Sequence, residues 1–311
     1  MSTPATLPEA PPAAPHPMAL AGLLAVGAAW GVGAPLVRLA RLEGYAALQI
    51  IAWHTVLGAL VLAAVLGFRG RWRLPLDRAS LRLYAVVAAL GIVLPHFAAF
   101  WALAHVPAAV HSVIVSLVPI FALGIALALR IETFHPARAL GLALGAAAVA
   151  VLVVPQMGLP GSTGGAFVLV SLIAPVCYAL EGIFVANLSR SQAGPMQALL
   201  GGTLIAAVVV VPAAAISGPL ALPPVAGWGG AEWGIVIAGA GGALAYAGYV
   251  ALLRAGGAVF AAQVGYVVTA AGVIWAMVLL GERPSRWLWL AMALLFAGLM
   301  LVRPRRAAAP T

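Results

Sequence analysis

A single carboxylate, Glu181, lies inside the apolar stretch 175–184, and no basic residue follows it before Arg190. In a membrane interior an ionised carboxylate costs on the order of 3 kcal/mol, so such a group is either neutral or placed beside water or a cation. Tyr178 precedes Glu181 by one helical turn on the same face. The pair predicts a site that presents a ring and an acid to one ligand, with proton exchange at Glu181 as a means of coupling. The alternative is an acid that bonds a neighbouring helix or extends toward the membrane surface.

Other candidate binding residues are aromatic or hydrogen-bonding side chains in further apolar stretches. They are His96, Tyr246, Tyr249, Gln263, Tyr266, Trp30, Trp101 and Ser116. An aromatic lining with a few polar groups is typical of a small-molecule pocket. Each aromatic residue taken singly also suits helix packing or an interfacial belt, which is the alternative for all of them. Glu132 and Glu282 end two apolar segments near arginines and are expected to have a structural role.

The composition identifies an integral membrane protein. Hydrophobic residues make up 64% of the 311 and charged residues only 7%, and the mean hydropathy is +1.11. The net charge of +9 does not indicate nucleic acid here, because all 16 basic residues are arginines and nearly all lie in connections between apolar segments. The single cysteine, Cys177, excludes an internal disulfide and a cysteine-based metal centre. No cofactor and no metal site is predicted.

Ten segments are long enough, or nearly so, to cross a hydrocarbon core of about 30 Å, which takes roughly 20 helical residues. They are 18–40, 46–68, 82–104, 109–130, 138–154, 164–188, 196–217, 232–253, 258–280 and 286–302. Lipid offers the backbone no hydrogen-bond partner, so an all-α integral membrane protein is expected. Residues 1–17 form a disordered proline- and alanine-rich arm in this interpretation, and residues 304–311 a short tail. Four prolines inside the segments are expected to bend them: Pro35, Pro95, Pro119 and Pro175.

The arginines predict the orientation of these segments. Alternating the connections between two sides places twelve arginines on one side and four on the other. The four are Arg38, Arg41, Arg283 and Arg286. The positive-inside rule then puts both termini of a multi-pass inner-membrane protein in the cytoplasm.

The ten segments divide into two related halves, 18–154 and 155–303. Shifting the chain by 150 residues places Gly91 on Gly241 and Glu132 on Glu282 without a gap. The same shift places His96 on Tyr246. Because each half has an odd number of helices, the halves must insert with opposite orientation, as two inverted five-helix repeats around a pseudo-two-fold axis.

In these features the sequence resembles the drug/metabolite transporter superfamily, EamA type, over roughly residues 18–303. The resemblance rests on Trp30-Gly31, on 102–109 (ALAHVPAA), on Pro119 thirteen residues before Glu132, and on 279–283 (LLGER). Two positions depart from the family pattern, namely Thr269 in place of a proline and His54 in place of an arginine. The resemblance implies ten helices in two domains and export of solutes.

These observations predict a secondary transporter, not an enzyme, for small organic solutes such as amino acids or amphiphilic metabolites, working by alternating access around a midplane cavity. The absence of arginine or lysine from the middle of any segment argues against phosphorylated solutes. A passive facilitator of the same fold is one alternative. A membrane haem protein is another, with ligands among His54, His96, His105 and His111. The partners expected are the solute and membrane lipid, with no nucleic acid. The oligomeric state, a homodimer included, is left open.

Overall fold

The protein is described here from a computed structural model, which places residues 17–133, 135–157, 164–187, 191–222 and 225–302. Apart from Pro17, the predicted arm (1–17) and tail (304–311) lie outside these described residues. Over the described ranges the chain forms helices and connections and no strand. The expected all-α fold is therefore confirmed.

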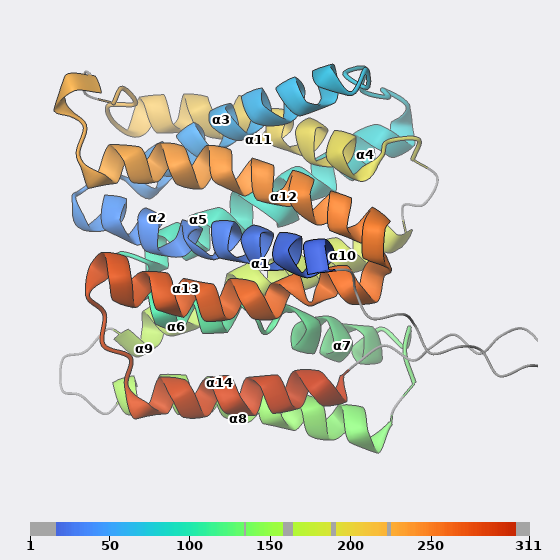
Figure 1. Cartoon of the computed structure of the whole chain (residues 1–311), viewed down its shortest axis with the longest axis vertical. Coiled ribbons are helices and arrows are strands. Elements are labelled where there is room, and N and C mark those ends of the chain that lie inside the picture. The colour runs from blue at the N-terminus through green and yellow to red at the C-terminus, as the bar shows by residue number, and fades with distance from the viewer. Residues whose placement is uncertain (1–16, 134, 158–163, 188–190, 223–224, 303–311) are drawn as a thin grey trace, which may run out of the picture.

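Helices follow one another along the chain as Figure 1 shows. The first half contains α1 (Pro17–Gly31), α2 (Gly33–Leu42), α3 (Ala47–Phe68), α4 (Arg78–Val86), the π-helical η1 (Val87–Val93), α5 (Leu94–Ala102), α6 (Ala108–Val115), α7 (Val118–Ala128) and α8 (Pro136–Met157). The second half contains α9 (Gly164–Ser171), α10 (Ile173–Asn187), α11 (Pro195–Ser217), the 3-10 turn η2 (Val225–Gly227), α12 (Gly230–Ala262), α13 (Val264–Leu280) and α14 (Arg286–Leu301). Within the described residues nine helical runs are long and apolar enough to span a membrane, and α14, with 16 residues, is a shorter tenth. Each of the ten predicted segments corresponds to one of these ten helical runs.

Each of the four prolines expected to bend a helix lies just after an irregularity in the helix assignment. Pro35 follows the break at Val32 between α1 and α2, and Pro175 follows the break between α9 and α10. Pro119 follows the break between α6 and α7, and Pro95 follows the π-helical η1. Proline has no N–H, so the carbonyl one turn before it loses its helical partner and the backbone can deviate there. The helices are therefore irregular at the four positions where the sequence predicted a disturbance.

The predicted connection between the eighth and ninth segments differs from the observed one. The sequence predicted an end at 253 and a new start at 258, whereas α12 runs through Arg254 to Ala262. Inside it only Gly257 leaves the helical conformation, with φ 75° and ψ 176°. Arginine is a good helix former, and only the glycine tolerates a positive φ without strain, so the kink is confined to one residue.

The helix contacts have the symmetry expected of an inverted repeat. Helix α3 packs on its counterpart α11, and α8 packs on its counterpart α14, at opposite sides of the bundle (Figure 1). In the first spanning segment α1 packs on α12 and α13, and in the related sixth segment α10 packs on the corresponding helices α5 and α7. Exchanging the two halves therefore maps each of these contacts onto another or onto itself, as a pseudo-two-fold axis requires.

The two ends of the bundle are packed differently. We call the end where α2 joins α3 and α13 joins α14 the Arg38 end, and the opposite end, where α3 joins α4, the Arg69 end. The largest cluster of buried apolar side chains joins both halves and reaches the Arg38 end through Val37, Leu103 and Ala231. Smaller, separate clusters occupy the Arg69 end between α3, α4, α11 and α12.

Candidate functional site

The carboxyl group of Glu181, on α10, lies directly against the backbone of Gly91 in η1. A β-carbon built on Gly91 would be 2.6 Å from Glu181 Oε1 and 2.9 Å from Oε2. Any side chain at residue 91 would overlap the acid, so glycine is what lets the two helices hold it there. The π-helical backbone of η1 is itself an irregularity of the kind found at functional sites.

Glu181 and Tyr246 line the same cavity. Its volume is about 330 Å³, and it lies between α4, η1, α10, α11 and α12. Ser191 and Ala193, from the connection that leads into α11, also line it, so the cavity reaches the Arg69 end. The remaining lining residues are Leu83, Val87, Val185, Pro195, Ala198 and Leu199. Among the described residues of the lining, Glu181 is thus the one ionisable carboxylate in a largely apolar wall.

Three of the predicted aromatic residues meet beside this cavity. Trp30 on α1 contacts Tyr246 edge-on, with ring centroids 6.4 Å apart, and contacts Tyr249 at 6.1 Å. Tyr246 and Tyr249 are 6.2 Å apart, one turn from each other on α12. The structure therefore brings residues from both halves into one aromatic cluster that adjoins the acid through Tyr246.

His96 pairs with His54, which the sequence singled out as a departure from the family pattern and as a candidate ligand in the haem alternative. The ring centroids of the two histidines are 6.2 Å apart, and Phe100 contacts both, stacking on His96 at 5.0 Å. His54 Nε2 and His96 Nδ1 are buried and have no hydrogen-bond partner among the described residues. Buried polar atoms without partners are costly, so these two nitrogens are candidates for hydrogen bonds with a polar solute.

Several predicted site residues lie elsewhere. Trp101 is 45% exposed and contacts Phe167 on α9, so it does not face Trp30. Tyr266 packs on Phe296 of α14. Tyr178 packs against the main core on α10, and Gln263 lies at the junction of α12 and α13.

Ser116 belongs to the contact between α6 and α13. Its hydroxyl bonds the hydroxyl of Thr269, which in turn donates to the carbonyl of Gly265 at 2.9 Å. Thr269 stands where the family pattern has a proline, and here it supplies a hydrogen bond between the two halves. Ser116 thus joins helices and does not line the Glu181 cavity.

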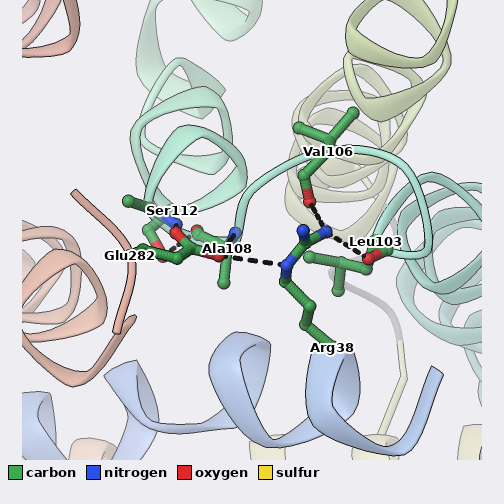
Figure 2. A network of polar contacts seen from close by, with 7 residues as sticks. Arg38, Leu103, Val106, Ala108, Ser112 and Glu282 are labelled. Carbon is green, nitrogen blue, oxygen red and sulfur yellow. Dashed lines mark hydrogen bonds and ion pairs between the residues drawn. The ribbon is translucent and has the colours of Figure 1, made fainter. Parts of the chain in front are cut away.

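At the Arg38 end an ion pair closes the bundle across the two halves (Figure 2). Arg38 Nε lies 3.0 Å from Glu282 Oε1, and the side chains are 16% and 12% exposed. Glu282 accepts hydrogen bonds from the backbone N–H groups of Ala108 at 2.7 Å and Ala109 at 3.0 Å, and so caps the start of α6.

Arg38 also bonds the connection that precedes α6. Its Nη1 donates to the carbonyl oxygen of Leu103 at 2.8 Å and to that of Val106 (Figure 2). Both residues lie in the connection between α5 and α6. We call this set, made of Arg38, Glu282 and the backbone groups they bind, the Arg38 lock. The sequence predicted a structural role for Glu282 near arginines but did not identify Arg38 as its partner. One signal was available, because Arg38 falls inside the predicted segment 18–40 and an arginine there needs a partner.

A second set of contacts reinforces the same end. Arg41 donates to the carbonyl of Phe100 at 3.0 Å and to that of Tyr45. The Tyr45 hydroxyl donates to Glu232, which caps the start of α12 through the N–H of Gly229 at 2.8 Å. Burial, and then the bond to Glu232, raises the pKa of Tyr45 to about 12, so this phenol remains a donor at neutral pH. Helices of both halves are thus tied together at the Arg38 end.

Comparison with known proteins agrees with this architecture. The EamA-like transporter family matches the chain twice, over residues 17–154 and 165–303. None of the curated proteins matches it. A solved structure described only as "Crystal structure of protein" is similar with a TM-score of 0.59 and 20% identity, over 90% of this chain and 97% of that one. At this identity the solved structure supports the fold alone.

Proposed function

Since this chain belongs to the EamA-like transporter family, whose members are membrane transporters, we propose that it is a secondary transporter that exports small organic solutes and binds them at Glu181. The observation that carries the proposal is the juxtaposition of the Glu181 carboxyl, Gly91 and Tyr246 at one cavity inside the helix bundle. Amino acids and amphiphilic metabolites are the solutes that we expect.

The lining of the cavity supports this choice of solute. A volume of about 330 Å³ suits a molecule of amino-acid size. A carboxylate attracts an ammonium group, and Tyr246, the member of the aromatic cluster that lines the cavity, offers a ring to a cation or an apolar side chain. The described lining residues include no arginine that would hold a phosphate. A neutral, zwitterionic or cationic solute therefore fits better than a phosphorylated one.

The distribution of arginines supports the orientation. Among the described residues the Arg69 end carries Arg69, Arg71, Arg73, Arg78 and Arg82, and the sequence count assigns twelve arginines to that side and four to the other. By the positive-inside rule the Arg69 end faces the cytoplasm of an inner-membrane protein. The Glu181 cavity would then admit solute from the cytoplasm, as export requires.

The proposal is tested with the purified full-length chain in proteoliposomes, by uptake of labelled amino acids with and without a pH gradient. We expect Glu181→Gln to abolish the response to the pH gradient, because the amide cannot carry a proton. The matched control is Glu43→Gln, which makes the same chemical change at an exposed residue outside the cavity and should transport like wild type.

The outcomes separate coupling from binding. Transport by Glu181→Gln that keeps its rate but ignores the gradient supports a proton-coupled carrier. An unchanged rate with an unchanged pH response would show that Glu181 has no part in transport. Wild-type flux that never runs against the solute gradient would identify a passive facilitator instead.

A further inference from the structure

Glu132 is the counterpart of Glu282 in the other half. The shift of 150 residues that relates the halves places Glu132 on Glu282 and Ala108 on Ala258. It also places Pro107, the residue before α6, on Gly257, the one non-helical residue of α12. Both of these residues have extended ψ angles, 141° and 176°, and a helical stretch begins after each. The backbone that Glu282 caps in one half therefore has an equivalent in the other half.

The two glutamates are in different situations in this structure. Glu282 is 12% exposed, bound by Arg38 and by two amides of α6. Glu132 is 45% exposed and pairs with Arg138, its neighbour in sequence, at 2.7 Å. The first arrangement closes the Arg38 end across the two halves. The second leaves its side chain partly in solvent at the Arg69 end, which is also the end that the Glu181 cavity reaches.

We propose that Glu132 and Glu282 are alternating locks: Glu282 caps α6 while the Glu181 cavity is open to the Arg69 end, and Glu132 caps the helical stretch after Gly257 when the protein opens at the Arg38 end. The inference rests on the proposed transport function, since it assigns these two residues to opposite states of one cycle. An ionised carboxylate is favoured at a helix N-terminus, where free N–H groups and the helix dipole both attract it. When the protein changes state, one glutamate leaves a helix start and the other glutamate binds the equivalent helix start. The bonds between carboxylate and N–H groups lost in one half are thus replaced in the other half.

The two glutamates have different arginine partners, although the backbone groups they would cap are related by the repeat. In this structure Arg38 pairs with Glu282, and Arg138 pairs with Glu132. In the opposite state Glu132 leaves Arg138 and accepts the N–H groups of Ala258 and Val259, the equivalents of Ala108 and Ala109. Gly257 can follow this movement because its backbone has access to positive φ.

The test uses cysteine accessibility in the full-length chain in nanodiscs, where both ends are in contact with reagent. The single native cysteine is removed by Cys177→Ala. Ser112→Cys, a nearly isosteric change of a buried residue one turn below the capped amides, reports on the Arg38 end. Ser191→Cys, in the cavity lining, reports on the Arg69 end. The reagent is a membrane-impermeant maleimide, and no solute is needed.

The two glutamine variants should change the labelling rates in opposite directions. Glu282→Gln is expected to raise the labelling rate at Ser112→Cys about tenfold, because it weakens one charged hydrogen-bonded contact. The same variant should slow labelling at Ser191→Cys. Glu132→Gln is expected to slow labelling at Ser112→Cys. Glu43→Gln, at the Arg38 end but outside the lock, should change neither rate. Rates that do not respond to Glu282→Gln, or that shift in the same direction in both variants, would overturn the proposal.

A second measurement covers the case in which Glu282→Gln does not fold. The pair Glu132→Cys and Ala258→Cys should form a disulfide under oxidation, and Arg38→Gln, which loosens the lock from its other side, should increase the yield. The proposal is contradicted if folded protein forms no disulfide, either with Arg38 present or in the Arg38→Gln variant. Neither of these measurements involves solute. The test of the alternating locks can therefore fail while the transport test of Glu181 succeeds, and the transport test can fail while the test of the locks succeeds.

Discussion

The Glu181 carboxyl occupies the space that a side chain at Gly91 would need: a β-carbon there would lie 2.6 Å from Glu181 Oε1. Gly241, which the 150-residue shift places on Gly91, has no atom within 4 Å of the same hypothetical carbon. The two related glycines therefore differ in their surroundings, and only Gly91 leaves space for an acid from the other half of the pseudo-symmetric bundle.

Gly91→Ala is expected to displace the flexible end of the Glu181 side chain and to reduce transport about tenfold, because the carboxyl would no longer occupy its place in the cavity lining. Gly241→Ala is the matched control, with open space for its methyl group. Initial rates of uptake in proteoliposomes check the difference. Equal rates for the two variants would mean that the position of Glu181 is unimportant.

Arg38→Gln should destabilise the protein by about 3 kcal/mol, because it leaves the partly buried carboxylate of Glu282 without its cation. Arg286→Gln, at an exposed residue of the same end, should have little effect. The thermal midpoint of unfolding in detergent measures both. The double variant Arg38→Gln/Glu282→Gln should lose less stability than the sum of the single ones, and strict additivity would argue against a direct ion pair.

Gly31→Ala is expected to weaken the packing of α1 on α13. Its β-carbon would lie 2.7 Å from the carbonyl oxygen of Val268 and 2.9 Å from the Ala271 β-carbon, and the backbone oxygen cannot move aside cheaply. Gly33→Ala, two residues later, meets no atom within 4 Å and should be neutral or slightly stabilising. A lower thermal midpoint for Gly31→Ala alone is the expected result. A similar loss in both variants would point to a general effect of helix rigidity.

Asp77 should make the start of α4 sensitive to acid. Its side chain accepts the Ser80 hydroxyl at 2.6 Å and the N–H groups of Ser80 and Ala79 at 3.0 Å each, and these bonds lower the pKa of the carboxyl. A carboxyl whose pKa is lowered by folding stabilises the folded state above its unfolded pKa of about 3.9 and loses this effect as the pH falls through the folded value.

The measurement for Asp77 is the difference in thermal midpoint between wild type and Asp77→Asn as the pH is lowered. Asparagine keeps a side-chain oxygen for the cap but has no proton to gain in this range. The advantage of wild type should be constant near neutral pH and shrink below about pH 4. A difference that grows on acidification would contradict the assignment.

Much of the fold could be predicted from the sequence, because it depends on local properties of the chain. Apolar runs of sufficient length must become helices in lipid, so the ten segments were found, and the prolines marked the irregular positions. The equivalence of Gly91 with Gly241, and of Glu132 with Glu282, was also found from the sequence, because the two repeats are related by a constant shift of 150 residues. The arginine counts predict an orientation for the same reason.

Only the tertiary structure decided which side chains meet. The helices are apolar on all sides, so their periodicity does not say which face is buried, and alanine-rich surfaces can pack in many ways. Tyr266 faces Phe296 and Trp101 faces Phe167, although their sequence positions suited the cavity equally well. Arg38 and Glu282 are far apart in the chain and meet only because α2, α6 and α13 converge at one end. Contacts of this kind arise from the packing of distant segments, which local sequence cannot encode.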